Sequence, residues 1–482
     1  MTNPKKHFFA VATLIVVSTI IYFPNGYFFL NDDFTHVARV SLLDLNTLFY
    51  SYRPLHDLLL VIVKQFSNTN PIGYHLVLLL LHILATVLVY FFGIALQQRY
   101  QTNAYLQAFA FLSSLCFSVY PFHSESILWI LGGGATLATI FSLLSLITFL
   151  NRERNKYLLF WSYISFGISL TAYESSWVIP ALIFYTIALD HLLKKNHLKN
   201  QLFHVFIFSL ILVLHLVFRK FVLGDLAGIY GSERLLHIQP RLWLYNYLCL
   251  VFRSFIPPFA SSNLFVFFSA IIAITWGLLF FLKKILRKNA LTIFFTFSFL
   301  IALIPVMPLG ISTHSRESER FLYFPSVFVC FLIINVLTQL FRDKKFTIAV
   351  SIVLVYFSFK TIQNCLTYST AGKIQQYTLK AIDSLSKKND RLELSNLIWE
   401  LNGIPVNRKG TKDGLLWLYN TDTNKVVFTD FIQLHSNKIT FNNYITFIEI
   451  TQEKINISDT SNSKSTSLFK GKIMYPFLKK TF

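Results

Sequence analysis

The sequence predicts a membrane all-α fold: a polytopic bundle of about 11 transmembrane helices with outer-face amphipathic helices, and a small C-terminal extracytoplasmic α+β domain. Three observations support this prediction. Hydrophobic residues make up 54% of the 482 residues. Apolar runs of about twenty residues, the length that crosses a bilayer, recur as far as residue 363. From about residue 364 the composition becomes polar, so we expect a membrane domain over 1–363 and a second domain over 364–482.

The apolar runs define the expected spans. The first run follows Lys5 and Lys6, and no small-residue cleavage site comes after it, so we interpret it as a retained anchor. Short polar links separate the later runs. The expected spans cover residues 8–23, 74–96, 104–120, 127–150, 157–172, 177–193, 201–218, 263–282, 291–308, 321–341 and 346–363.

Charge in the links predicts the orientation. The links on one side hold fourteen Lys and Arg residues, whereas the short links on the other side hold two. Because cytoplasmic links carry the excess of positive charge, we expect a multi-pass protein of the cell (inner) membrane with a cytoplasmic N-terminus and an extracytoplasmic C-terminus. Arg219 and Lys220 fall on the outer face, against this trend. The net charge of +20 is thus concentrated in topogenic links, which argues against nucleic-acid binding.

The longer polar segments have patterns of their own. In the first outer loop, 25–73, helical spacing over 37–48 and 55–63 predicts amphipathic helices at the membrane interface. The loop over 223–262 has the same character. In the C-terminal region we expect a helix over 373–401, strands over 414–419, 426–431 and 439–450, and a flexible stretch over 456–467.

The predicted outer face collects acids close to the bilayer. Asp32 and Asp33 are adjacent carboxylates a few residues from the first span, which by default is a functional-site hypothesis. His123, Glu125 and Glu174 lie in very short links, where an acid near hydrocarbon needs a cation or a metal as its partner. Taken singly, each residue is better explained as a solvated loop residue, and only the set indicates a site.

Basic groups accompany these acids. Arg53 and Arg320 lie beside aromatic and apolar residues, where a guanidinium suits the anionic phosphate of a lipid. Simple snorkelling at the interface is the alternative for Arg320. The same outer face also contains His56, Glu233, Arg234 and Glu319.

Six segments of the chain together resemble the GT-C membrane glycosyltransferases. The likeness is to the group that includes the transmembrane and tetratricopeptide-repeat O-mannosyltransferases and their bacterial relatives, and it extends from residue 1 to about 340. This chain departs from the family pattern at Tyr173, where relatives tend to have Lys, and it lacks the tetratricopeptide repeats. The segments are 31–33, 52–55, 70–75 with 81–82, 121–125, 173–175 and 319–326.

The resemblance implies a reaction and roles for residues. A sugar would pass from a polyprenyl-phosphate carrier to a hydroxyl-bearing acceptor, an envelope glycan, lipid or protein, on the outer face of the membrane. Asp32 would act on the acceptor, with Asp33 as its partner. Glu319 and Arg320 would lie near the carrier phosphate. The remaining polar positions of the outer links, which would contribute to substrate binding, are Arg53, His56, His123, Glu125 and Glu174.

The residues alone allow the same chemistry. Displacing a sugar from a lipid phosphate with inversion needs one carboxylate as base and no general acid, because phosphate leaves well. Two neighbouring carboxylates separate their pKa values, so one stays ionised near neutral pH, and we hypothesise that Asp32 is this base. Arg53, Arg320, or a divalent cation (Mg²⁺ or Mn²⁺) held by Asp32, Asp33 and Glu174 would offset the charge on the departing phosphate.

Other classes of protein stay open at this point. A lipid-linked glycan polymerase or ligase would use outer-face Arg and His residues more than acids. A secondary transporter would place ionisable residues near mid-span and would show two matching halves. An envelope scaffold would need no clustered acids at all.

Overall fold

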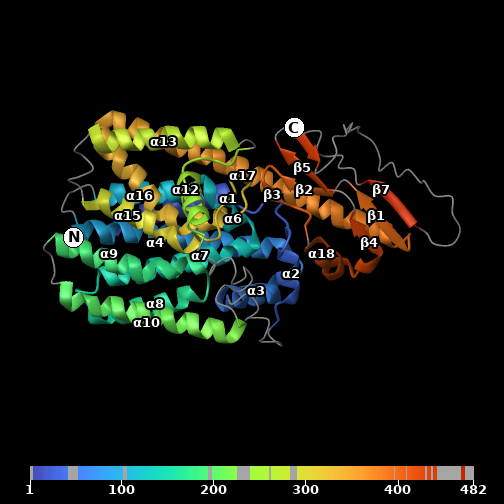
Figure 1. The fold of residues 1–482 in the computed structure, drawn as a ribbon, viewed down its shortest axis with the longest axis horizontal. Helices are drawn as coiled ribbons and strands as arrows, with labels where there is room; N and C mark the ends of the chain where they lie inside the picture. Colours follow the sequence, from blue (N-terminus) through green and yellow to red (C-terminus); the bar gives the residue numbers. More distant parts are fainter. Residues whose placement is uncertain are drawn as a thin grey trace.

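In the computed structural model, a bundle of long helices leads into two small sheets (Figure 1). The structure describes residues 4–41, 53–100, 106–193, 198–224, 239–259, 262–282, 290–395, 397–408, 410–428, 431–435, 438–441 and 468–472.

The helices of the bundle follow the order of the predicted spans. Short 3-10 turns (η) interrupt the bundle where polar links meet it. In the first part of the chain the elements are α1 (Pro4–Tyr22), α2 (Asp33–Arg39), α3 (Pro54–Ser67), α4 (Pro71–Tyr100), α5 (Leu106–Ser118), η2 (Pro121–His123), α6 (Ser124–Leu128), η3 (Ile130–Gly132), α7 (Gly133–Leu150), α8 (Lys156–Leu170), η4 (Glu174–Val178) and α9 (Ile179–Leu192). The later helices are α10 (Leu198–Leu223), α12 (Pro240–Arg253), α13 (Ser262–Leu282), α15 (Ala290–Ala302), η6 (Ile304–Val306), η7 (Glu319–Leu322), α16 (Tyr323–Leu340) and α17 (Asp343–Ser386).

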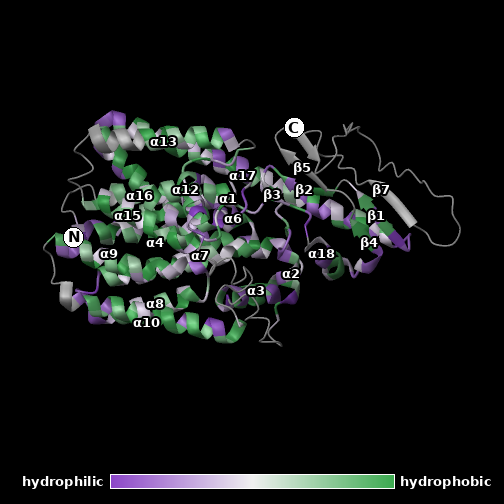
Figure 2. Cartoon of the chain, in the orientation of Figure 1, coloured by the Kyte–Doolittle hydropathy of each residue, from purple (hydrophilic) through white to green (hydrophobic). Residues whose placement is uncertain are grey.

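The chain is a multi-pass membrane protein by the length and apolarity of its helices. Among the described residues, 7 helices are long and apolar enough to cross a membrane. The other predicted spans coincide with α5, α8, α13 and α15, which do not meet that test over the described residues. The total of 11 spans therefore stays a prediction. Outward-facing apolar side chains, such as Phe203, Leu214 and Phe221 on α10, form the surface expected against lipid, and Figure 2 shows how apolar the bundle is.

Helix α17 joins the bundle to the C-terminal sheets. It runs for 44 residues without interruption, so the predicted boundary between residues 363 and 364 falls inside one helix. The predicted helix over 373–401 is wrong in its second half, because α17 ends at Ser386 and two strands follow. Leu392 and Leu394 are buried while their neighbours are more exposed, the two-residue alternation of a strand. The good helix formers in this stretch concealed that alternation.

Two sheets and a helix form the C-terminal part. The first sheet has the order β4-β1-β7 with parallel pairs, and the second has the order β3-β2-β5-β6. The predicted strand over 414–419 is wrong: these residues belong to helix α18 (Gly410–Tyr419), whose buried residues recur with helical spacing. The strands are β1 (Arg391–Ser395), β2 (Leu397–Leu401), β3 (Ile404–Pro405), β4 (Val426–Phe428), β5 (Phe431–His435), β6 (Lys438–Phe441) and β7 (Leu468–Lys472). The expected flexible stretch, 456–467, and most of the strand expected over 439–450 lie outside the described residues.

The C-terminal part packs against the first outer loop. Gly410, at the start of α18, lies so close to the first loop that a Cβ there would be 1.9 Å from the carbonyl oxygen of Asn31. Thr35 donates a hydrogen bond from Oγ1 to the carboxylate of Asp413. On the other side, the backbone N–H of Arg316 donates to the carbonyl oxygen of Gly403 at 2.9 Å. The C-terminal part is therefore fixed to two of the loops that carry predicted site residues, the first outer loop and the loop before η7.

Candidate active site

The two adjacent aspartates have different surroundings. Asp33 is fully buried, and its carboxylate accepts the backbone N–H groups of Leu30 at 3.0 Å and Leu131 at 3.2 Å. Burial raises the pKa of Asp33 to about 8, although these hydrogen bonds act in the opposite direction. Asp33 thus joins the first loop to η3. Asp32 is partly exposed and lines two neighbouring cavities.

We call the first of these the arginine cavity. Its volume is about 140 Å³. It is lined by Asp32, His36, Arg53, His56, Asp57, Trp129, Leu131, Glu174, Arg219 and Arg320.

We call the second the interdomain cavity, because the C-terminal part forms one of its walls. Its volume is about 260 Å³. It shares Asp32, Trp129 and Arg320 with the arginine cavity. Its other lining residues are Leu30, Asn31, Glu125, Arg316, Glu317, Tyr368, Trp399, Ile404, Pro405 and Arg408.

Glu174 organises the arginine cavity. Arg53 Nη2 donates to one carboxylate oxygen of Glu174 at 2.9 Å, and Arg219 Nη2 donates to the other at 2.9 Å. Tyr173 lies in the link after α8 and has an extended backbone conformation. Glu174 comes directly after it, as the first residue of the short turn η4. One buried acid thus fixes the guanidinium groups of two arginines that line this cavity.

Arg320 connects the two cavities. Its side chain pairs with the carboxylate of Glu125, and its backbone N–H donates to the same carboxylate at 2.7 Å. Arg320 Nε also donates to the Tyr173 hydroxyl at 2.9 Å, while the guanidinium of Arg53 lies 4.3 Å from the centroid of the Tyr173 ring. Tyr173 thus bridges the two arginines. Burial raises the pKa of Glu125, and Arg320 opposes that effect.

Two histidines from the first loop line the arginine cavity. His56 is buried, with Nδ1 3.7 Å from the carboxylate of Asp57. Burial, with Arg39 nearby, lowers the pKa of His36 to about 4. His36 is therefore neutral near pH 7 and adds no charge to the cavity.

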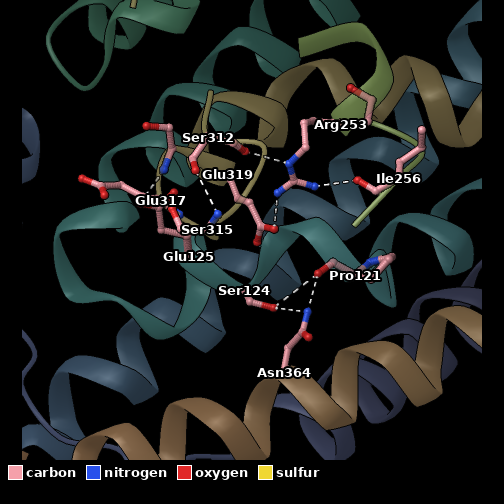
Figure 3. Close-up of polar contacts among 12 residues, drawn as sticks. Pro121, Ser124, Glu125, Arg253, Ile256, Ser312, Ser315, Glu317, Glu319 and Asn364 are labelled. Atoms are coloured by element: carbon pink, nitrogen blue, oxygen red, sulfur yellow. Dashed lines mark hydrogen bonds and ion pairs between the residues drawn. The ribbon is translucent and has the colours of Figure 1, made fainter. Parts of the chain in front are cut away.

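Two predicted substrate-binding residues lie in the protein interior. His123 is fully buried, with Nε2 2.6 Å from Ser326 Oγ, and its ring packs on Phe117. Glu319 is also fully buried, at 2.7 Å from Arg253 Nη2, and Figure 3 shows it facing Arg253. Neither residue lines the arginine cavity or the interdomain cavity. Both side chains have partners within the protein, as buried polar groups require, and their predicted part in substrate binding stays a prediction.

Arg253 is fixed by several partners. It donates to the carbonyl oxygens of Ser312 at 3.0 Å and Ile256 at 2.6 Å, in addition to Glu319 (Figure 3). Nearby, Asn364 of α17 donates to the carbonyl oxygen of Pro121 at 2.7 Å and to Ser124 Oγ at 3.0 Å. These contacts hold the loop before η7 and the start of α6, and with them Glu125 and Arg320, in place.

The predicted metal ligand set is not formed. Among the described residues, no group of three or more His, Cys, Asp or Glu side chains is placed to hold a metal ion. Asp33 accepts backbone N–H groups, and both carboxylate oxygens of Glu174 accept from arginines. As they lie in this structure, Asp32, Asp33 and Glu174 are not placed together to hold a divalent cation, and the need for Mg²⁺ or Mn²⁺ stays a prediction.

Sequence reasoning missed several residues of the site. Arg219 was noticed only as a basic residue on the wrong face, and its pairing with Glu174 explains that exception. Asp57 lies in an amphipathic helix, and its burial was not predicted. Trp129 and Arg316 belong to none of the sequence motifs that indicated the site. The predicted residues Glu233 and Arg234 lie outside the described residues.

The sequence comparison gives one partial relative. No protein-family model matches the chain. Over 106 residues the chain is 35% identical to a protein O-mannosyl-transferase of Caenorhabditis elegans. This stretch is 22% of the chain and 15% of the relative, so the chain spans a small part of that protein.

The structure comparison gives distant neighbours. The oligosaccharyltransferase of Archaeoglobus fulgidus aligns at 13% identity and a TM-score of 0.43, over 85% of this chain and 61% of that one. ArnT from Cupriavidus metallidurans, bound to undecaprenyl phosphate, aligns at 11% identity and a TM-score of 0.43, over 88% and 92% of the two chains. TM-scores under 0.5 do not establish a common fold. The predicted resemblance to protein O-mannosyltransferases is confirmed for the 106 residues that match by sequence.

Proposed function

We propose that this protein is a membrane glycosyltransferase that moves a sugar from a polyprenyl-phosphate carrier to a hydroxyl group of an acceptor on the extracytoplasmic face. One observation carries the proposal: Asp32 lines both cavities, together with Arg320 and Trp129. A base that removes a proton from one substrate and faces the reacting carbon of another must lie between them. The match to an O-mannosyl-transferase supports the same class of reaction.

The arginine cavity suits the carrier phosphate. A polyprenyl-phosphate sugar is a phosphodiester with a single negative charge, and the departing phosphate carries about two near neutral pH. Arg53 and Arg219, both held by Glu174 at this cavity, would offset this increase by donating hydrogen bonds to the phosphate. Arg219 lies on α10, whose exposed apolar side chains give the polyprenyl chain a path along the bilayer.

Asp32 would be the base in this reaction. Its carboxylate takes the proton of the acceptor hydroxyl while the acceptor oxygen forms a bond to the anomeric carbon of the sugar. The bond between that carbon and the phosphate oxygen breaks, and the phosphate leaves with the electron pair. Attack opposite the leaving group inverts the anomeric configuration, and no acid is required because phosphate is a good leaving group.

The test is an assay of carrier release. The purified full-length protein is incubated with a panel of polyprenyl-phosphate sugars and a cell-envelope extract as the source of acceptors, and free polyprenyl phosphate is measured. We expect release with one of the sugars, and no release when Asp32→Asn replaces the wild type. Asp343→Asn, an exposed aspartate at the start of α17, is the matched control and should release carrier normally. Absence of release with every donor would refute the proposal.

A further inference from the structure

The interdomain cavity has a wall that the membrane part does not supply. Trp399 of β2, Ile404 and Pro405 of β3, and Arg408 face Asp32 and Trp129 across about 260 Å³. A cavity that includes the proposed base but lies outside the arginine cluster is the place for the second substrate. The residues of this wall therefore indicate the chemical class of the acceptor.

The wall is held firmly in position. Arg408 Nη1 donates to both carboxylate oxygens of Glu317 at 3.2 Å, and Gly403 accepts the backbone N–H of Arg316 at 2.9 Å. Gly410 contacts the backbone of Asn31, next to Asp32. These contacts place Trp399 and Asp32 in a fixed relation, as a binding site for a defined ligand requires.

Two tryptophans from different parts of the chain line this cavity. Each is partly exposed, and each has a guanidinium over its ring: Arg320 lies 5.1 Å from Trp129, and Arg408 lies 5.1 Å from Trp399. Tyr368 adds a third aromatic side chain to the lining. Apolar ring faces surrounded by charged hydrogen-bonding groups match a sugar, which offers C–H groups on its faces and hydroxyl groups around its edge.

The interdomain cavity also contains Arg316, a cation that no ion pair among the described residues neutralises. Glu125 pairs with Arg320, and Glu317 pairs with Arg408. Arg316 forms no ion pair with the described residues, and its Nε is buried without a hydrogen-bond partner among them. Leaving a buried guanidinium N–H without a hydrogen bond costs free energy. A ligand oxygen could accept this hydrogen bond, and an anionic oxygen would do so most strongly.

We infer that the acceptor is a saccharide with an anionic group, bound in the interdomain cavity with its rings against Trp129 and Trp399, its anionic group on Arg316, and a hydroxyl group at Asp32. This inference rests on the proposed function, because it assumes that Asp32 activates the acceptor. It assigns acceptor recognition to the C-terminal part. The anion on Arg316 has one other possible source, the carrier phosphate, and the experiment separates the two.

The experiment measures glycan binding without catalysis. Full-length protein in lipid nanodiscs is applied to an array that pairs neutral oligosaccharides with the same chains bearing uronic acid or phosphate groups. We expect tighter binding to the anionic member of at least one pair. Trp399→Ala should weaken that binding about tenfold or more, and Arg316→Gln should remove the preference for the anionic member.

Matched controls separate binding from folding. Arg391→Gln on β1 and Trp161→Ala on α8 change exposed side chains of the same types and should leave binding unchanged. Trp399→Phe should retain most of the binding that Trp399→Ala loses. If Arg316→Gln raises the KM for the polyprenyl-phosphate sugar and leaves the glycan preference intact, the carrier phosphate is the ligand and the inference is wrong.

The outcomes distinguish the inference from the proposed function. Absence of glycan binding, with carrier release still dependent on Asp32, would overturn the inference and leave the glycosyltransferase standing. Loss of carrier release in all conditions would overturn the proposed function, whatever the array shows.

Discussion

The two cavities that meet at Asp32 are built from different parts of the chain. The arginine cavity uses only residues between Asp32 and Arg320, all within the bundle and its loops. The interdomain cavity needs Trp399 and Arg408, which come after α17. The first is dominated by ion pairs, and the second by aromatic rings between charged groups. The difference suggests that donor chemistry belongs to the bundle and acceptor choice to the C-terminal part.

Apart from the replacement of Asp32, the largest expected effect comes from the arginines of the arginine cavity. Arg219→Gln removes one of the two cations on Glu174, and we expect kcat/KM for the donor to fall about 100- to 1,000-fold, as for other groups that stabilise a developing anion. Lys220→Gln, an exposed neighbour on the same helix, is the matched control and should have normal kinetics. A normal kcat/KM for Arg219→Gln would remove this cavity from donor binding.

The next effect concerns the attachment of the C-terminal part. Gly410→Ala places a Cβ against the carbonyl oxygen of Asn31, so α18 must shift and widen the interdomain cavity. We expect the KM for the acceptor to rise about tenfold while the donor KM changes much less, because Arg53 and Arg219 of the arginine cavity lie in the bundle and its loops. Gly167→Ala is the control, since nothing lies within 4 Å of a Cβ at that position. Equal changes in both KM values would contradict the separation of the cavities.

A smaller effect is expected at Tyr173, which contacts both Arg53 and Arg320. Tyr173→Phe removes the hydroxyl that accepts from Arg320 Nε but keeps the ring beneath Arg53. One lost hydrogen bond to a charged group should lower turnover about threefold to tenfold. Steady-state kinetics with each substrate varied in turn would check this. An unchanged rate would mean that Tyr173 does not position Arg320.

The last effect is on stability, not on rate, and concerns Asp33. The pKa of Asp33 is raised to about 8 in the folded state, so the folded protein keeps a proton that the unfolded chain loses above about pH 4. The stability from this group is therefore lost as pH rises from about 4 to 8, by at most about 1.4 kcal/mol per pH unit. Thermal unfolding at several pH values should show a decline in Tm that Asp33→Asn flattens and Asp32→Asn largely retains. The same decline in both variants would contradict the separate roles of the two aspartates.

The sequence allowed much of this arrangement to be predicted. Every predicted span coincides with a helix, because long apolar runs are a strong signal. Asp32, Arg53, His56, Glu125, Glu174 and Arg320, all predicted as site residues, line one cavity or both.

The rest could not be predicted because link length does not tell which way a side chain points. His123 lies in a short link, as Glu174 does, and Glu319 lies at the end of a longer one, yet both point into the interior, toward Ser326 and Arg253. The contribution of Trp399 depends on the turn of the chain after α17, and propensity favoured a helix there instead of strands. Arg219 did leave a signal, as a cation that violated the charge asymmetry of the links.

The central claim is that Asp32 acts on the acceptor between two occupied cavities, and a single-turnover measurement with Asp32→Asn tests it most directly. Donor binding to this variant should remain close to that of the wild type, since the arginines are unchanged, while transfer to the acceptor should fall about 1,000-fold or more. Transfer at the wild-type rate by an Asp32→Asn protein that binds donor normally would contradict the account.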